Sequence, residues 1–363
     1  MARIYKSRQC NLIYGTKTMN RIIFLCIILF SSTTVVYAGS SALPWVQLNV
    51  RPSIQTKDDS QISLLPKDEE LTEGDAVFLY QKAIQSIPKD FNSLQFANWR
   101  KLPDDLEQLP VEEIETELKN LKPTIDFLKQ AATCRQCNWP PIKPGQMTQK
   151  DLDDLALYRS LSFILDVQAK LQIVQNQYDK AIETIKTNLK MTNNFGGAPY
   201  LNYAMVGIAM EAINIQRIEQ LIQSKNAPNL YHALKDLPQP LADANKAIKV
   251  ETDNLQNHNF LLRSQYRKIL EPAHERVRKQ MNYVDRKIAA LQIMEALRLY
   301  AGSHDDKLPE KLSDVTDIKI PDDPVTKKPF EYKSTGNEAV LTIEGTENSD
   351  GRDSVHYEIK LKE

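Results

Sequence analysis

Apolar residues recur at spacings of three and four over most of the chain, which predicts a mainly α-helical protein. The first such run, Ala76 to Ile87, ends at Pro88. The second, Val111 to Ala132, contains Pro123, so we expect a kinked helix or two short helices there. Further helices are predicted over residues 151–176, 178–191, 200–223 and 273–300, with a short one between Tyr231 and Leu237.

Two of these helices are expected to form an antiparallel hairpin, because only a short connection near Asn176 separates residues 151–176 from residues 178–191. The order of Tyr178 and Ala181 in the second helix resembles that of tetratricopeptide hairpins, in which alanine lets paired helices approach closely. A 34-residue period is missing, so the prediction is one tetratricopeptide-like hairpin within a helical bundle.

The pattern changes after Gly302, where short stretches alternate between apolar and polar residues. Strands are expected at residues 330–333, 339–343 and 354–362, with turns at Gly336-Asn337 and Asp350-Gly351. The predicted fold class is therefore mainly α, with a helical domain at 72–302 and a small C-terminal antiparallel β appendage at 303–363. Residues 39–71 are polar and contain scattered prolines, and they are expected to form an extended or disordered arm.

The N-terminal residues have the order of a secretory signal peptide. Five basic residues and no acidic one precede Ala38, and an apolar run covers Ile22 to Phe30. Small residues near Ala38 suit cleavage after that position. A run of nine residues is far shorter than the ~20 that span a membrane, so residues 1–38 are interpreted as a cleaved signal and not as an anchor. We expect a periplasmic or equivalent extracytoplasmic protein, with Met19 as an alternative start.

Cleavage after Ala38 changes the formal charge from −1 to −6, because the removed segment carries only positive charges. An acidic exported chain lacks the basic face that nucleic-acid binding requires. Charge is also uneven along the mature chain. Residues 263–298 hold nine basic and four acidic side chains, whereas residues 305–363 hold nine basic and fifteen acidic ones. This asymmetry indicates either two solvated faces or complementary surfaces, within the chain or with a partner.

Cys134 and Cys137 are the two cysteines that remain after cleavage, and in an oxidising compartment they are expected to form a short disulfide. A thiol-disulfide redox site that also uses Trp139 is the alternative. It is disfavoured because the pair follows a predicted helix, whereas reactive thiols commonly sit at a helix N-terminus. Free thiols remain a third possibility.

Other cofactor chemistry lacks its motifs, and no cofactor is expected. Covalent haem attachment requires histidine after the second cysteine, but position 138 is asparagine. A zinc site needs about four ligands, and no histidine lies near the two cysteines. The five histidines show no metal-binding spacing and are expected at the surface or at helix ends. They are His232, His258, His274, His304 and His356.

The C-terminal segment resembles the C-terminal part of type II secretion major pseudopilins. The resemblance rests on Leu308-Pro309, Asp323-Pro324, Pro329-Phe330-Glu331-Tyr332 and Asp350-Gly351, in that order. A pseudopilin also needs a prepilin cleavage site and an assembling N-terminal helix, which are missing here, so the resemblance implies a local fold and no secretion role. Calcium binding in some pseudopilins makes Asp350 and Asp353 weak metal candidates, against the alternative of a solvated turn.

Residues 130–245 are similar to a group of exported helical bacterial proteins without an established function. The similarity is carried by Cys137-Asn138-Trp139, the hairpin from Tyr178 to Ala181, Gly207-Ile208-Ala209, and the segment from Ala227 to Pro238. It implies a fold and no activity.

The sequence thus favours a non-catalytic exported scaffold, accessory or assembly subunit that binds a protein partner or a second copy of itself. The thiol redox protein is one alternative. Another is a helical module that binds a peptide or small ligand in a groove lined by Tyr200, Tyr203 and Met210.

Overall fold

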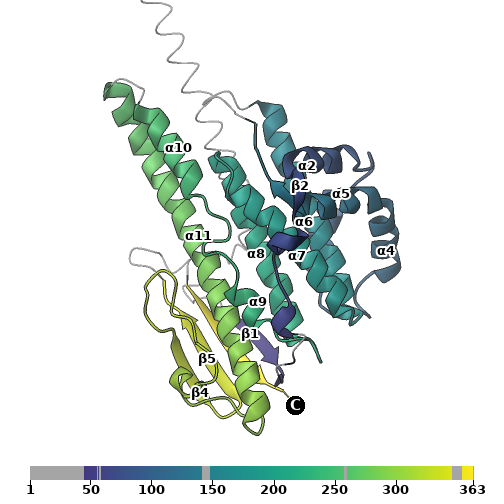
Figure 1. Cartoon of the computed structure of the whole chain (residues 1–363), viewed down its shortest axis with the longest axis vertical. Helices are drawn as coiled ribbons and strands as arrows, with labels where there is room; N and C mark the ends of the chain where they lie inside the picture. Colours follow the sequence, from purple (N-terminus) through teal and green to yellow (C-terminus); the bar gives the residue numbers. More distant parts are fainter. Residues whose placement is uncertain are drawn as a thin grey trace, which may run out of the picture.

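The computed structural model describes residues 45–54, 56, 59–140, 148–256, 260–345 and 354–362. The protein is mainly α-helical with a small β part, as the sequence predicts, and Figure 1 shows the helices beside a four-stranded sheet. The described residues contain these α-helices: α2 (Ala76–Gln85), α3 (Ser93–Trp99), α4 (Val111–Asn120), α5 (Lys122–Ala132), α6 (Gln149–Val174), α7 (Tyr178–Gly196), α8 (Leu201–Gln223), α9 (Tyr231–Lys235), α10 (Asn245–Gln256) and α11 (Phe260–Ser303).

Most predicted helices are confirmed, and their boundaries follow local signals. Asp75 caps α2 by accepting a hydrogen bond from the Val77 amide, and Thr148 and Asp151 form a capping box at the start of α6. Residues 111–132 form two helices, α4 and α5, and Pro123 stands in the first turn of α5, where a missing amide hydrogen costs little.

The long helix α11 begins at Phe260 and not near Ala273, so the expected start was wrong by more than three turns. Pro272 lies inside the helix. A proline there removes one backbone hydrogen bond and usually marks a helix start, which is why the sequence pattern placed the boundary at that point.

The central helices pack closely because glycine and alanine bring their backbones together. A Cβ atom added to Gly207 of α8 would lie 2.5 Å from the backbone nitrogen of Gly196 in α7. A Cβ atom on Gly196 would lie 2.3 Å from the Cα of Ala242. The predicted α6–α7 hairpin is present, and Ala181 is fully buried in it.

The four-stranded sheet has the order β1-β6-β5-β4. Its strands are β1 (Trp45–Val50), β4 (Glu331–Thr335), β5 (Glu338–Ile343) and β6 (Val355–Leu361). The β4–β5 hairpin turns at Gly336-Asn337 as predicted, with Gly336 at φ 70°. The predicted turn at Asp350-Gly351 lies outside the described residues.

Strand β1 corrects the prediction of an extended or disordered arm at residues 39–71. It pairs in parallel with β6, with Trp45 opposite His356 and Val50 opposite Leu361. Short 3₁₀ helices, η1 (Asp59–Gln61) and η2 (Asp68–Glu70), follow it, and Leu64 between them is buried. The described part of this segment, from Trp45 onward, therefore packs with the folded body.

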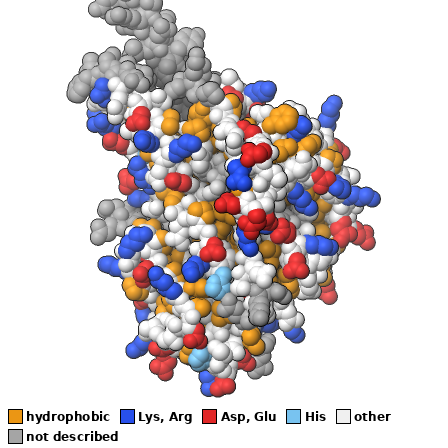
Figure 2. Space-filling model, in the orientation of Figure 1, with side chains coloured by type: hydrophobic (Ala, Val, Ile, Leu, Met, Phe, Trp, Pro, Cys, Tyr) orange, Lys and Arg blue, Asp and Glu red, His pale blue; other side chains and the backbone are white. Residues whose placement is uncertain are grey.

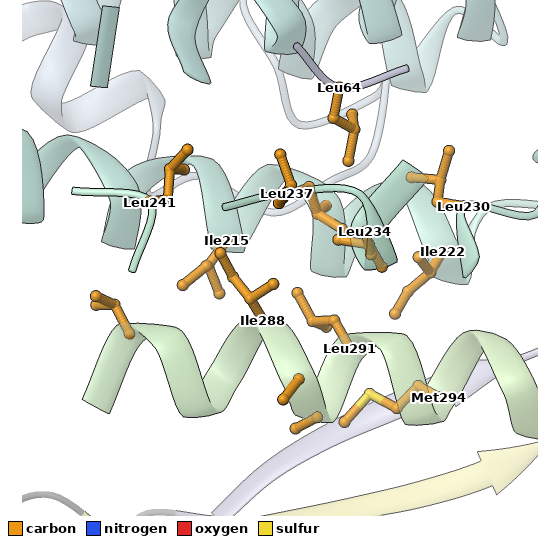
Figure 3. Packing of buried hydrophobic residues seen from close by; sticks show 14 of the residues in the cluster. Leu64, Ile215, Ile222, Leu230, Leu234, Leu237, Leu241, Ile288, Leu291 and Met294 are labelled. Atoms are coloured by element: carbon orange, nitrogen blue, oxygen red, sulfur yellow. The ribbon is translucent and has the colours of Figure 1, made fainter. Parts of the chain in front are cut away.

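The small C-terminal β part that the sequence predicts is present, and it shares a core with the helices. Leu341, Tyr357 and Ile359 of the sheet belong to the same buried cluster as α8, α9 and α11. Figure 3 shows part of this cluster: Ile288 and Leu291 of α11 face Ile215 and Ile222 of α8 and the leucines of the 230–241 segment, whereas Met294 lies on the side of α11 toward the strands. A second core lies among α2 to α8. The 3₁₀ helix η3 (Leu312–Asp314) lies between α11 and β4.

Candidate interaction surface

Cys134 begins strand β3 (Cys134–Gln136), which runs parallel to β2 (Thr72–Asp75) in a short second sheet, and Cys137 follows directly after β3. Both Cys134 and Cys137 are free thiols in the structure, and Cys134 is buried. Burial, with a smaller contribution from the Asp75 charge, raises the pKa of Cys134, and the same two causes raise the pKa of Cys137 to about 12. Lys190 acts in the opposite direction but does not offset burial. The thiolate needed for redox exchange is therefore disfavoured, and the disulfide stays a prediction.

Trp139 is part of an aromatic cluster in the second core. Its ring lies 4.6 Å from that of Phe195 and 4.7 Å from that of Tyr203, measured between centroids, and its indole nitrogen donates to the Asn194 carbonyl oxygen at 3.1 Å. Because its nitrogen is hydrogen-bonded and its ring is packed among other aromatic rings, Trp139 contributes to the core.

The expected groove lined by Tyr200, Tyr203 and Met210 is not formed. Tyr203 is 6% exposed and Met210 is fully buried, because α8 packs on all sides. Tyr200 is half-buried and donates a hydrogen bond to the Pro140 carbonyl oxygen. The three residues thus belong to or border the core.

The described histidines each have a separate neighbour. His274 pairs with Glu251 at 2.8 Å, His304 stacks on Tyr300, and His356 stacks on Trp45. His232 contacts the Tyr231 ring, whereas His258, Asp350 and Asp353 lie outside the described residues. Within the described ranges, no three His, Cys, Asp or Glu side chains form a group suited to a metal ion.

A buried ionic network, which sequence reasoning missed, joins α3, α6 and α8. Asp166 is fully buried on α6 and lies 2.5 Å from Nε of Arg100 and 2.8 Å from Nε of Arg217. Lys170 pairs with Asp104 at 2.9 Å, and burial lowers the pKa of Lys170. The sequence offered one indication of this network, because Asp166 is a charged residue between Leu165 and Val167 in a largely apolar helix. The network ties three helices together.

A second missed feature is a pair of buried carboxyl groups between α8 and α11. Burial, and then the charge of Asp285, raise the pKa of Glu211, which is fully enclosed. Burial raises the pKa of Asp285 to about 7. Glu211 accepts a hydrogen bond from the Ala242 amide at 3.3 Å. Burial thus shifts both carboxyl groups toward their protonated forms.

The helices α10 and α11 form a two-helix arm, defined here as residues 245–256 and 260–280, which stands at one edge of the molecule (Figure 1). Ala247 and Ile248 of α10 are buried at its base, together with Val277 and Met281 of α11. Beyond this base, none of the described side chains from Lys249 to Ala273 is buried. We define the arm tip as residues 249–256 and 260–273. It covers about 21 Å of α11, and its described side chains are all at least partly exposed.

The arm carries a different charge from the remainder of the chain. It has eight basic and four acidic side chains, a net +4, whereas the remainder of residues 39–363 carries −10. Figure 2 shows its lysines and arginines at the surface, interspersed with acidic groups. Two exposed ion pairs, Arg267–Glu271 at 3.3 Å and Lys279–Glu275 at 3.4 Å, join neighbouring turns of α11, and such pairs add little stability.

The expected charge complementarity is met within the chain at one point, where Arg286 of α11 lies 2.7 Å from Asp323 and both side chains are buried. The charges of the arm lie outside that contact.

Three comparisons with known proteins, against family models, curated proteins and solved structures, find no match for this chain. In the part of the chain that the structure describes, no helix has both the length and the apolar character of a membrane span.

Proposed function

We propose that this protein is an exported, non-catalytic accessory subunit that binds an acidic protein partner through its α10–α11 arm. The observation that carries the proposal is the arm tip. From Lys249 to Ala273, every side chain that the structure describes is at least partly exposed, and the arm carries a net positive charge on an otherwise acidic chain.

The energetics of helices support a partner for the tip. Isolated helices of this length are marginal in water, and most helical stability in proteins comes from packing of an apolar face. Segments with few buried apolar contacts belong to the least stable part of a fold. A partner that covers the tip would bury its exposed side chains, and complementary charge would guide the approach of the partner.

A binding role also agrees with the chemistry of the other polar groups. The two thiols have raised pKa values, and Asp166 and Arg217 form a buried ion pair with 2.8 Å between Oδ1 and Nε. These groups stabilise the fold where they lie. The extracytoplasmic compartment rests on the N-terminal charge and apolar pattern of residues 1–38.

Charge reversal in the arm tests this function. In Arg267→Glu with Lys268→Glu, two exposed basic residues of the tip become acidic. We expect loss of the partner complex on native gels of host extract, with the free chain's melting temperature unchanged within about 2 °C. The matched control reverses Lys129 and Lys235, which are exposed on α5 and α9, and should leave the complex intact.

Two outcomes would count against the proposal. If wild-type protein migrates only as a monomer in extracts from its own host, there is no partner to bind. If both double variants weaken the complex equally, binding depends on the net charge of the chain and not on the arm. A complex that contains only this chain would assign the arm to self-association.

A further inference from the structure

A cleft of about 470 Å³ opens where strand β1, the end of α8, the α6–α7 connection and the loop after α3 meet. Its lining includes Arg51, Leu106, Ile173, Tyr178, Gln220 and Lys225. None of these residues belongs to the arm, so the cleft is separate from the surface assigned to the proposed partner. Its volume is in the range of small-molecule sites.

Arg51 is held at the cleft by contacts on both its backbone and its side chain. Its carbonyl oxygen accepts a hydrogen bond from Nε of Arg298 at 3.0 Å, and its Nη1 donates to the Gln223 carbonyl oxygen at 3.2 Å. The Nε atom of Arg51 is buried and has no hydrogen-bond partner. A fixed guanidinium with an unused N–H group is suited to an oxyanion.

Gln220 supplies a second unused donor. Its side chain is 5% exposed, and its Oε1 accepts a hydrogen bond from Nη1 of Arg217, which fixes the orientation of the amide. The Nε2 atom of Gln220 is buried without a partner. Because a buried donor that lacks an acceptor is costly, two such donors in the lining of one cleft indicate a ligand oxygen.

The acidic residues of the cleft are already engaged. Oδ1 of Asp104 lies 2.9 Å from Nζ of Lys170 and 3.5 Å from Nη1 of Arg217. Asp105 accepts hydrogen bonds from the Glu107 amide at 3.0 Å and from the Gln108 side chain at 3.1 Å. The charge of Asp104 is thus compensated by Lys170 and Arg217. Asp105 is hydrogen-bonded by neutral groups and keeps its charge, which Arg51 and Lys225 in the same lining oppose.

The remaining wall is apolar. Ile173 at the end of α6 is 2% exposed, Val174 beside it is partly buried, and Leu106 on the facing loop is 45% exposed. An exposed leucine at the rim of a partly polar cleft can cover an apolar group that enters it. The ligand therefore needs one apolar part in addition to its oxygens.

We propose that this cleft binds a carboxylate that is attached to a small branched apolar group. The carboxylate oxygens accept from Nε of Arg51 and Nε2 of Gln220, and the apolar group lies against Leu106, Ile173 and Val174. Both nitrogens are shielded from solvent, so the cleft has to open around them before the ligand oxygens can reach them. The same chemistry occurs in free branched carboxylic acids and at the C-terminus of a peptide ending in leucine.

Calorimetric titration of the mature chain distinguishes these sources. The probes are 4-methylpentanoate and acetyl-Ala-Ala-Leu with a free C-terminus, each compared with its amide. We expect one site per chain and at least tenfold weaker binding of either amide. Tighter binding of the acid assigns a free metabolite, and tighter binding of the peptide assigns a C-terminal carboxylate.

The discriminating variant is Gln220→Glu, which keeps the acceptor for Arg217 and replaces the unused donor with an acidic oxygen. It should weaken carboxylate binding at least tenfold. Leu106→Asp, at an exposed position, should have a similar effect and covers the case in which the Gln220 variant does not fold. Lys235→Gln, which removes a positive charge on α9, should change the Kd by less than twofold.

The proposal is overturned if neither acid binds saturably, if the amides bind as tightly as the acids, or if Gln220→Glu and Leu106→Asp both fold and bind like the wild type. None of these results affects the arm, so failure here is distinguishable from failure of the proposed function.

Discussion

Glu251 of α10 and His274 of α11 form a pair at the base of the arm tip, with 2.8 Å between Oε2 and Nε2. His274 is 5% exposed, whereas the described side chains from Lys249 to Ala273 all retain solvent contact. This pair therefore marks the boundary between the packed base of the arm and its tip.

Removal of this pair should loosen the tip and leave the body intact. We expect Glu251→Ala to raise amide hydrogen exchange in residues 249–273 by at least tenfold, because the tip belongs to the least stable part of the fold. The melting temperature should change by less than about 2 °C. Glu271→Gln, which removes an exposed pair with Arg267, is the matched control and should leave exchange unchanged. If the two variants show the same exchange rates in the tip, the tip does not depend on the Glu251–His274 pair.

Asp285 should make stability fall with rising pH. Burial raises its pKa from 3.8 to about 7, so the folded state prefers the protonated form. The penalty is absent below the unfolded pKa near 4, grows as pH rises from there to about 7, and is constant above. Its upper bound is on the order of 4 kcal/mol. Asp285→Asn should thus be more stabilising, relative to the wild type, at pH 8 than at pH 4, as measured by urea unfolding. An equal difference at both values would refute a raised pKa.

Gly302 should not tolerate a side chain, because the N-terminal segment crosses α11 there. A Cβ atom at this position would lie 2.2 Å from the backbone oxygen of Ser53, whose amide donates to the Arg298 carbonyl oxygen at 2.9 Å. We expect Gly302→Ala to lower the free energy of unfolding by about 1–3 kcal/mol. Gly197→Ala, where the nearest contact is 3.4 Å, should change it by less than about 1 kcal/mol. Equal effects would show that the crossing is adaptable.

The reduced thiols should react slowly. With a pKa of about 12 for Cys137 and a raised pKa for Cys134, the thiolate fraction at pH 8 is small. Alkylation by iodoacetamide should be at least ~100-fold slower in the folded mature chain than in urea. Rapid labelling of the folded protein would restore the thiol redox alternative. The intact mass of protein isolated from its native compartment tests the predicted disulfide separately.

Local pattern was sufficient for most of the helices and for the β4–β5 hairpin, because apolar spacing and a Gly-Asn turn report directly on burial and chain reversal. It failed for β1, since that strand pairs with β6, more than 300 positions away in the sequence. Such pairing leaves no local signal. The start of α11 was missed for the opposite reason. Pro272 is a strong local indication of a helix boundary, but α11 continues through it.

The candidate sites were less accessible from sequence. The sequence does not distinguish the buried polar residues Asp166, Glu211 and Gln220 from exposed polar residues of the same helices. Their burial results from the packing of α6, α8 and α11. Tyr203 and Met210 illustrate the reverse error, since an apolar helix face that suggests a groove is filled by its neighbours. Cys134 and Cys137 were found from their spacing, but their pKa values depend on the burial and on Asp75, which only the fold provides.

The binding role of the arm is tested most directly by photocrosslinking in the native host. A photoreactive amino acid is placed at Ser264 or Gln265, both exposed on the tip, and at Lys119 on α4 as the matched exposed control. The account predicts one discrete adduct with an acidic protein from both tip positions, lost in the Arg267→Glu, Lys268→Glu background and absent at position 119. Adducts that are absent from the tip, or identical at the tip and at position 119, would contradict it.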